Sequence, residues 1–185
     1  MPTYLETASG IAILPVSVEH AAALAALVRQ NIAHLHAYLP AVANLSTVEA
    51  ARSHLLAAME RAASGDIHEW HIFVDGSLCG AIRLKDIDRE DRKAKIGYFL
   101  AKQFTGKGIV TAAVSAVLAY CFDHLHLNRI ELRFASGNEA SRRVAERLGF
   151  SPEGLLRQDE CLNGVFVDLY VYGLLADEFR AYRHG

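Results

Sequence analysis

The sequence predicts an α+β fold in which helices flank one mixed sheet. Asp75-Gly76 and Asn163-Gly164 each separate two apolar runs, and such dipeptides favour tight turns between antiparallel strands. Residues 96–134 have instead the pattern of a strand, a helix and a strand, and this crossover predicts two parallel neighbours. One mostly antiparallel sheet that contains a single parallel pair accommodates all three segments.

Length and composition indicate one folded domain. The chain has 185 residues, of which 52% are hydrophobic and 22% charged, as in globular proteins with a substantial core. A formal net charge of −2 provides no basic field, so nucleic acid is not an expected partner. The longest uncharged run, residues 108–122, is shorter than the roughly 20 residues that span a bilayer, so no membrane partner is expected.

Cysteine and histidine usage predicts neither disulfides nor a metal site. Cys79, Cys121 and Cys161 are odd in number and far apart, which is typical of reduced thiols in a cytoplasmic protein. Residues 1–17 lack a basic segment that leads into an apolar one, so no signal peptide is expected. Three close histidine pairs, at 34/36, 68/71 and 124/126, lack nearby carboxylates or thiols and do not indicate bound metal.

The N-terminal region is expected to begin with a strand and a helix. Residues 11–16 alternate weakly and form the strand, and Ser17 can cap a helix that continues to Ile32. The following segment, residues 34–43, is expected to be an apolar loop ended by Pro40.

A second helix is expected over residues 48–63. Thr47 can cap it, and Gly65 can terminate it in a left-handed conformation. Three of its apolar side chains are expected to face the core: Leu55, Leu56 and Met59.

The middle of the chain predicts a hairpin and a further strand. Residues 70–74 and 78–84 are the two hairpin strands. The charged stretch 85–95 is expected to be a solvated loop or turn, and residues 96–100 form the next strand.

The C-terminal half predicts two helices, a strand and a second hairpin. A strand is expected over residues 130–134, and a short helix that opens at Ser136 or Asn138 and ends near Leu148. The hairpin strands are residues 155–162 and 165–174. Before them, a long helix places one apolar face toward the sheet: Val110, Val114, Val117, Leu118, Cys121 and Leu125.

The most distinctive segment is the apolar strand ending at Leu100, which is followed by Gln103-Phe-Thr-Gly-Lys-Gly108 and an uncharged helix. Such a turn directs unpaired N–H groups and the positive end of a helix toward one point, as in a phosphate site. The turn is not a Walker loop, because Gly108 follows Lys107, nor a dinucleotide fingerprint, because Thr111 replaces its third glycine. A tight strand-to-helix connection is the alternative.

A second motif lies downstream, where Asn138-Glu-Ala-Ser141 is followed by Leu148-Gly-Phe150 and Gly154. Together with the glycine turn and the closing hairpin, it resembles the GNAT superfamily of N-acetyltransferases. More narrowly it is similar to the RimJ/RimL-type branch, which acetylates ribosomal-protein N-termini. The resemblance covers about residues 10–178. It implies one GNAT domain of the acyl-CoA N-acyltransferase fold, whose sheet splays open between two parallel strands, and acetyl-coenzyme A as co-substrate without a metal.

The resemblance also implies the coenzyme contacts. The pantetheine arm would lie against the strand end at Phe99, Leu100 and Ala101 and would bond to Asn138, while Arg143 or Arg142 could approach the nucleotide phosphates. A solvated helix face is the alternative for each arginine. The pyrophosphate would lie on the turn and the helix start: Gln103, Gly106, Lys107, Gly108, Ile109 and Val110.

Acetyl transfer requires a hydrogen-bond donor that stabilises the oxyanion and a proton for the leaving thiolate. A backbone N–H near Leu100 or Ala101 can serve the oxyanion. Many members of the superfamily place a tyrosine seven residues after the asparagine as the acid, but Ala145 stands there. Ser141 is the best remaining donor, and a local hydrogen bond at the helix start is its alternative.

Glu160 is the candidate general base. With a two-residue turn at Asn163-Gly164, Glu160 lies opposite Val167 and shares an apolar sheet face, where its pKa should rise toward neutrality. In the RimL-like branch, a glutamate just before the hairpin resembles the proposed base. An edge-strand glutamate that reaches water is the alternative.

The expected acceptor is the α-amino group of a protein N-terminus. An α-amine has a pKa of about 8 and lysine about 10.4, so deprotonating lysine costs roughly 3 kcal/mol more at neutral pH. The family forms its acceptor groove near His34, Tyr38 and Pro40, for which core or loop packing is the alternative. A small amine acceptor, a non-catalytic acyl-CoA sensor and a homodimer remain open. A nicotinamide oxidoreductase is disfavoured, although Glu131 has a suitable spacing.

Overall fold

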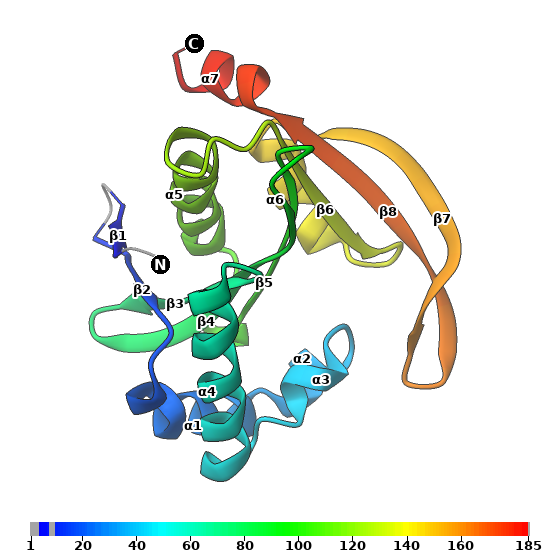
Figure 1. Cartoon of the computed structure of the whole chain (residues 1–185). Helices are drawn as coiled ribbons and strands as arrows, with labels where there is room; N and C mark the ends of the chain where they lie inside the picture. Colours follow the sequence, from blue (N-terminus) through cyan, green and yellow to red (C-terminus); the bar gives the residue numbers. More distant parts are fainter. Residues whose placement is uncertain (1–3, 8–9, 185) are drawn as a thin grey trace.

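The computed structural model describes residues 4–7 and 10–184, and in that part of the chain it contains one sheet (Figure 1). The strands are β1 (Leu5–Glu6), β2 (Ala12–Pro15), β3 (His68–Val74), β4 (Ser77–Asp88), β5 (Lys93–Leu100), β6 (Arg129–Ala135), β7 (Ser151–Leu162) and β8 (Val165–Leu175). Their order is β1-β2-β3-β4-β5-β6-β8-β7, and only β5 and β6 pair in parallel. The predicted mixed, mostly antiparallel sheet is confirmed.

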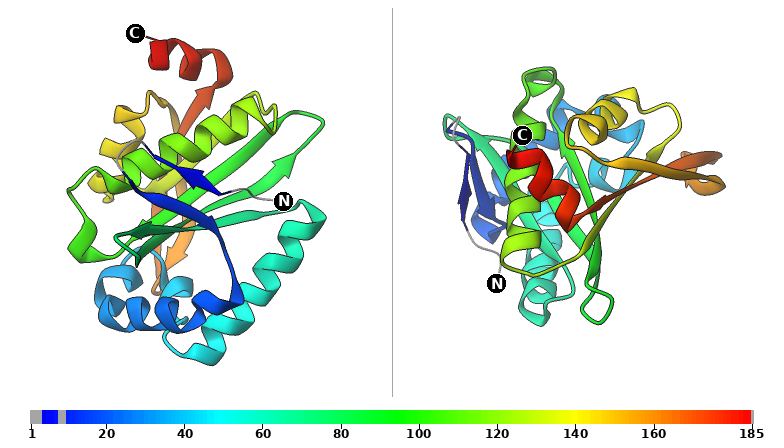
Figure 2. Two further views of the ribbon diagram at one scale, coloured as in Figure 1. Left: turned by 90° about the vertical axis from the view of Figure 1, so that its left-hand side faces the viewer. Right: turned by 90° about the horizontal axis from the view of Figure 1, so that it is seen from above.

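Helices cover both faces of this sheet (Figures 1 and 2). The helices are α1 (Ala21–Gln30), α2 (Ile32–His36), α3 (Pro40–Ala43), α4 (Val48–Ser64), α5 (Ile109–Asp123), α6 (Glu139–Arg147) and α7 (Ala176–His184), with the short 3-10 helices η1 (Val18–His20) and η2 (Lys102–Phe104). The larger core cluster joins α5 to strand side chains such as Trp70 and Ile82. A second cluster joins α1 and α4 to Leu78 on the opposite face.

The parallel strands β5 and β6 are joined by α5, as the crossover predicts. They pair only where Lys93–Ile96 of β5 lies beside Arg129–Leu132 of β6. Beyond these pairs, β5 continues to Leu100 along β4, and β6 continues to Ala135 along β8. The sheet is therefore open between the ends of the two strands, and this space is called the opening below.

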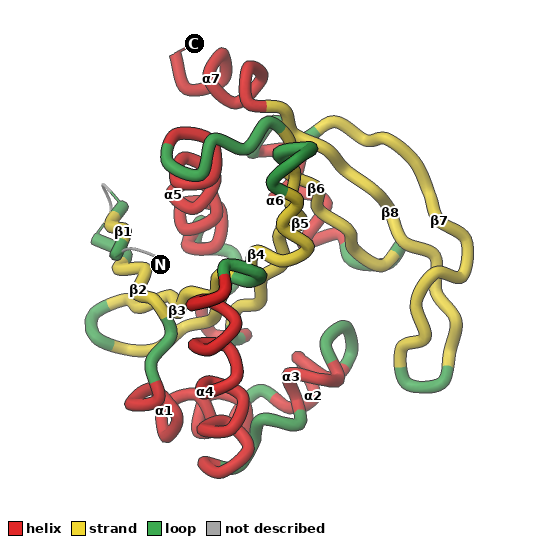
Figure 3. The backbone as a smooth tube through the Cα atoms, viewed as in Figure 1, coloured by secondary structure: helices red, strands yellow, loops and turns green. Residues whose placement is uncertain are grey.

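Both predicted hairpin turns are confirmed. Asp75 and Gly76 have φ angles of 48° and 73°, and Asn163 and Gly164 have 53° and 82°. Two successive residues with positive φ define the type I′ turn that suits a two-residue hairpin. The second hairpin is longer than predicted, because β7 begins at Ser151 directly after α6. In Figure 3 it extends to one side of the sheet, and its tip at Asn163 contacts α2.

The charged stretch 85–95 differs from the predicted loop, because β4 continues to Asp88 and β5 begins at Lys93. Asp86 has a positive φ of 53° at an irregularity in the β4–β5 pairing. Its carboxylate pairs with Lys95 at 2.9 Å. The predicted turn is limited to residues 89–92, and the other charges of the stretch, such as Lys85 and Lys93, lie on exposed strand positions.

The segment between α1 and α4 also differs from prediction. Ser17 caps η1, and α1 ends at Asn31, whose amide donates to the Leu27 carbonyl. The predicted loop contains α2 and α3, and Pro40 begins α3, where proline fits the first helical turn. Because these helices are one turn long, their apolar sequence shows no clear helical period.

The helix α4 has its predicted ends but a different buried face. Thr47 caps it, and Gly65 adopts a left-handed conformation with φ of 82°. The prediction was wrong for Leu56 and Met59, which are 44% and 40% exposed. Small side chains let α4 approach the core closely, since its buried residues are Ala51, Leu55, Ala58 and Ala62.

Candidate active site

The opening between β5 and β6 presents backbone groups of β5. The Ala101 N–H donates to the Cys79 carbonyl at 2.8 Å, so it is not available to an oxyanion. That bond makes Leu100 and Gly80 a cross-strand pair without mutual hydrogen bonds. The N–H and C=O of Leu100, and by alternation those of Tyr98, therefore turn toward the opening, whereas those of Phe99 turn toward β4.

The glycine turn connects the end of β5 to the start of α5. Gly106 and Gly108 have φ angles of 76° and 75°, a region that side chains with a Cβ rarely adopt. The Ala112 N–H donates to the Gly108 carbonyl, so the N–H groups of Ile109 and Val110 precede the first helical bond. Backbone donors and the positive helix end thus converge beside the opening, as the phosphate-site hypothesis requires.

The polar side chains of the turn are exposed. Gln103 lies in η2, and within the part of the chain that the structure describes no hydrogen bond holds its side chain elsewhere. The Lys107 ammonium lies 5.8 Å from the centre of the Phe104 ring. Both side chains are therefore accessible to an anion held on the turn.

The helix α6 begins beside the opening at Asn138. The Asn138 side-chain oxygen accepts the Ser141 N–H at 3.1 Å, so this oxygen caps the helix and only the amide nitrogen is left for pantetheine. The Arg142 guanidinium lies 4.8 Å from the centre of the Tyr170 ring and near Glu139. Arg143 is exposed, so of the two arginines it is the more accessible to phosphate.

Tyr98 is a candidate site residue that the sequence analysis missed. Ala145, at the position of the family tyrosine, is fully buried in the core. The Tyr98 hydroxyl is buried at the opening without a well-aligned partner among the described residues. Burial raises the pKa of Tyr98 to about 12, and a weak interaction with Ser141 opposes that rise. The signal was available, because a phenol in an apolar strand that ends at a glycine turn needs a partner.

Glu160 lies opposite Val167, as predicted, but its side chain is exposed. The pairing shifts between Leu156 and Glu160, where Gln158 has a φ of 52° and donates its N–H to Asp168. This bulge carries β7 outward, so the apolar face does not enclose the carboxylate. The alternative of an edge-strand glutamate that reaches water describes its surroundings.

The segment α2–α3 contacts both sides of the opening. His34 Nε2 lies 3.2 Å from the Leu100 carbonyl, and the Tyr38 hydroxyl donates to the Gly137 carbonyl before α6. The Asn163 amide at the tip of the β7–β8 hairpin donates to the His36 carbonyl at 2.9 Å. The predicted acceptor region is thus a bridge between β5, α6 and the hairpin.

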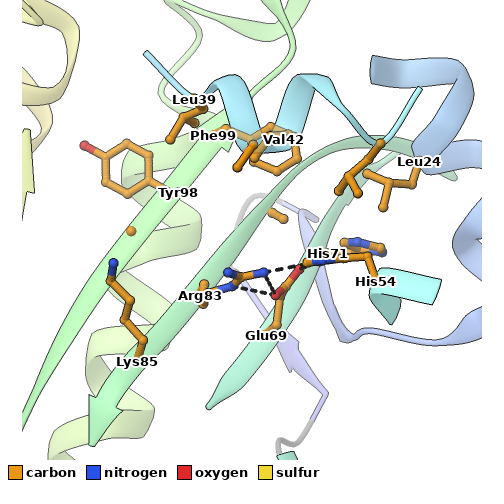
Figure 4. A pocket seen from close by; sticks show the side chains of 14 residues that line it. Leu24, Leu39, Val42, His54, Glu69, His71, Arg83, Lys85, Tyr98 and Phe99 are labelled. Atoms are coloured by element: carbon orange, nitrogen blue, oxygen red, sulfur yellow. Dashed lines mark hydrogen bonds and ion pairs between the residues drawn. The ribbon is translucent and has the colours of Figure 1, made fainter. Parts of the chain in front are cut away.

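A cavity of about 240 Å³ lies beside β5 on the face covered by α1, α3 and α4 (Figure 4). Apolar side chains such as Leu39 and Phe99 line one part of it, and Glu69, His71 and Arg83 line another. The described residues contain no helix long and apolar enough to cross a membrane and no cluster of metal-binding side chains. Cys79, Cys121 and Cys161 are unpaired.

Comparisons with known proteins extend these observations. The family model described as "Acetyltransferase (GNAT) domain" matches residues 11–151. The chain is 42% identical over 158 residues to "Putative ribosomal N-acetyltransferase YdaF" of Bacillus subtilis (strain 168), which covers 84% of this chain and 86% of that protein. It is 33% identical over 106 residues to "Ribosomal-protein-serine acetyltransferase" of Escherichia coli (strain K12), 57% of this chain and 59% of that protein.

A solved structure has the same overall architecture. The structure of RimL, described as the ribosomal L7/L12 alpha-N-protein acetyltransferase in complex with coenzyme A, superposes with a TM-score of 0.90 at 26% identity. It covers 95% of this chain and 99% of that one. The range matched by the family model contains the opening, the glycine turn and α6.

Proposed function

The chain belongs to the GNAT acetyltransferase family and is an N-acetyltransferase, and we propose that its acceptor is the α-amino group of a protein N-terminus. Ribosomal proteins are the first candidates, since the two named relatives and RimL are described as acting on them. The proposal includes acetyl-coenzyme A as donor, a catalytic domain over residues 10–178 and a cytoplasmic location.

The observation that carries the proposal is the Leu100 N–H, which neither β4 nor β6 pairs and which lies between the glycine turn and α2–α3. A coenzyme whose pyrophosphate lies on Gly106–Gly108 can extend its pantetheine arm into the opening. The acceptor amine then approaches from the side of α2–α3. Both substrates would meet at the end of β5, beside the unpaired Leu100 N–H.

The reaction begins when the neutral amine attacks the thioester carbonyl carbon. The new C–N bond forms, and the carbonyl oxygen takes the electron pair and accepts the Leu100 N–H. The C–S bond then breaks, and its electron pair leaves on the coenzyme sulfur. The amine loses one proton, and the thiolate gains one.

Ser141 and Tyr98 are proposed as the proton source for the thiolate. An isolated serine hydroxyl is a very weak acid, whereas Tyr98 has a pKa of about 12 and stays protonated at neutral pH. Ser141 can pass its proton to the sulfur while Tyr98 replaces it. This pair supplies the acid that the family tyrosine would provide at Ala145.

Glu160 is proposed as the base that receives the amine proton, directly or through water. Its exposure leaves it in contact with solvent at the hairpin. An exposed carboxylate is a weak base, and it suits an α-amine, of which roughly a tenth is already neutral at pH 7. Deprotonating a lysine acceptor would cost roughly 3 kcal/mol more at neutral pH.

The test is to incubate the protein with labelled acetyl-coenzyme A and purified ribosomal proteins, then to locate the label by peptide mapping. The same proteins with blocked N-termini are the control, and only the unblocked set should be labelled. Label confined to lysine side chains would overturn the proposal. Label only on polyamines, amino acids or antibiotics would establish the small-amine alternative, and no transfer at all would favour a sensor.

A further inference from the structure

Small residues form the floor of the cavity beside β5. Gly97 and Ala81 lie beneath it, and a Cβ added at Gly97 would meet no atom within 4 Å. Gly97 directly follows Ile96, the last β5 residue that pairs with β6. The roof is apolar and comes from α1 and the α3 region: Leu24, Leu39, Ala41, Val42 and Leu45.

Three residues on neighbouring strands align the cavity with the opening. Glu69 on β3 lies opposite Arg83 on β4, and Arg83 lies opposite Gly97 on β5. Neighbouring strands are about 5 Å apart. Arg83 therefore lies on β4, directly beside β5, and by the proposed function the backbone of β5 holds the reacting thioester.

Glu69 is buried, with 4% of its surface exposed, and its hydrogen-bonding capacity is already used. His54 Nε2 lies 3.0 Å from one carboxylate oxygen, and Arg83 Nε donates to the other at 2.7 Å. Burial raises the pKa of Glu69, but His54 and Arg83 outweigh it and hold that pKa below its usual value. The carboxylate is thus charged and satisfied, so it anchors Arg83 and is not itself seeking a ligand.

His71 contributes an unused acceptor at the inner end of the cavity. The Ser17 N–H donates to His20 Nδ1, so His71 Nδ1, 2.9 Å from that atom, carries the proton of the pair. His71 Nε2 is then an acceptor, and it is buried with no partner among the described residues. A buried lone pair is costly unless a donor reaches it, so this end of the cavity suits a water molecule or another donor and not a carboxylate.

Two cationic side chains at the outer end have unused donors. Arg83 uses Nε and Nη2 for the Glu69 carboxylate, and its Nη1 donates to none of the residues that the structure describes. The Lys85 ammonium forms no ion pair in the part of the chain that the structure describes, and Figure 4 shows it directed toward Tyr98. With Glu69 neutralised by Arg83, Lys85 leaves the cavity with excess positive charge.

We propose that this cavity binds a carboxylate carried by the acceptor itself, close to the amine that is acetylated. The inference rests on the proposed function, and it names the acceptor class as an α-amine with an acidic group one or two carbons beyond the α-carbon. The amine lies over Gly97 and Tyr98, the methylene groups contact Leu39 and Val42, and the carboxylate meets Lys85 and Arg83. An N-terminal glutamate or aspartate of a protein and a free acidic amino acid share this chemistry.

The test uses peptides that differ only in their first residue, Glu, Gln or Lys, and free glutamate. Dissociation constants are measured by calorimetry with coenzyme A bound, and kcat/KM with acetyl-coenzyme A. The Glu peptide should bind roughly tenfold more tightly than the isosteric Gln peptide, because a charge-assisted contact is lost in the latter. Lys85→Met should remove most of that ratio. Lys93→Met, which deletes a lysine paired with Asp88 at the far end of β5, should preserve it.

Measuring both binding and turnover distinguishes a failure of the carboxylate site from a failure of the proposed N-terminal acetylation. Equal affinity for the Glu and Gln peptides, or a ratio that survives Lys85→Met, would overturn the inference even if every peptide is acetylated. A Glu preference in binding without any turnover would sustain the carboxylate site and overturn the proposed N-terminal acetylation. Free glutamate that outperforms the peptides would keep the site and assign the carboxylate to a small acceptor.

Discussion

The two sides of the opening between β5 and β6 are built from different parts of the chain. On the α5 side, the groups that face the proposed coenzyme site are backbone groups of Leu100 and of the turn at Gly106–Gly108. On the α1–α4 side, the groups that line the cavity are side chains such as Arg83 and His71. A backbone site depends on φ and ψ, whereas a side-chain site depends on residue identity. Substitutions should therefore separate coenzyme binding from acceptor binding and stability.

The largest effect is expected at the backbone site. Gly108→Val should weaken coenzyme A binding by roughly 100-fold, since a β-branched residue is strained at positive φ and the turn must change shape. Calorimetry measures the affinity, and circular dichroism should show nearly unchanged helix content. Gly154→Val is the matched control, because a Cβ there meets no atom within 4 Å and φ is not positive. Unchanged coenzyme A affinity in Gly108→Val would contradict a coenzyme site built from the backbone of this turn.

Substitutions of Tyr98 test the proposed proton relay. Its backbone faces the opening, and its hydroxyl is the proposed acid. Tyr98→Phe should lower kcat by roughly 30-fold with little change in coenzyme affinity, which is within the range of acid–base contributions. Ser141→Ala should have a similar effect, and the double variant should lose little more, because the two hydroxyls act in one relay. Tyr172→Phe on β8 is the control. Multiplicative losses in the double variant would contradict the relay.

The buried His71 side chain should make the free energy of unfolding depend on pH. Burial and the neighbouring His20 lower the pKa of His71 from 6.5 to about 3. Between these values the unfolded chain binds more protons, so stability is full above pH 6.5 and falls as pH drops toward 3. The loss should be about 2 kcal/mol from pH 7 to pH 5.

Urea unfolding at these two pH values measures that loss, which His71→Gln should reduce. His36→Gln, at an exposed histidine, should retain the wild-type difference. His20 contributes to the same slope, because burial also lowers its pKa. If His71→Gln and the wild type lose stability equally, the buried histidine is not the cause.

The smallest effect is expected at Glu160, which belongs to neither side of the core. Because the carboxylate is exposed, Glu160→Gln should lower the rate only by roughly three- to tenfold at pH 7. The deficit should shrink near pH 9, where most α-amine is already neutral. Asp159→Asn, one residue away in β7, should leave the pH–rate profile unchanged. A deficit that persists at pH 9 would assign Glu160 a role other than base.

The same difference explains what the sequence could predict. The hairpins and the glycine turn depend on φ and ψ of adjacent residues, so dipeptides such as Asn163-Gly164 reveal them. The cavity joins Glu69, Arg83 and His54 from β3, β4 and α4, and no local motif links them. A partial signal existed, because a glutamate and a histidine alternate with Trp70 and Ile72 in a strand that should be buried.

Other misses have equally local causes. Leu56 was expected in the core because it is apolar, but the core face of α4 is set by alanines that permit close helix packing. The exposure of Glu160 follows from the bulge at Gln158, whose positive φ no sequence rule predicts for glutamine. The sequence therefore predicted that Glu160 lies opposite Val167 but did not predict that its side chain is exposed.

The short pairing between β5 and β6 also affects how the molecule responds to its surroundings. Four residue pairs join β5 to β6, and beyond them these two strands are not paired with each other. A pantetheine arm bonded to both edges would act as a removable ninth strand and resist their separation. By mass action the melting temperature should rise with coenzyme concentration. At a coenzyme concentration one hundred times the dissociation constant, the free energy of unfolding should increase by about 2.7 kcal/mol. The lifetime of the protein would then depend on the supply of its own substrate.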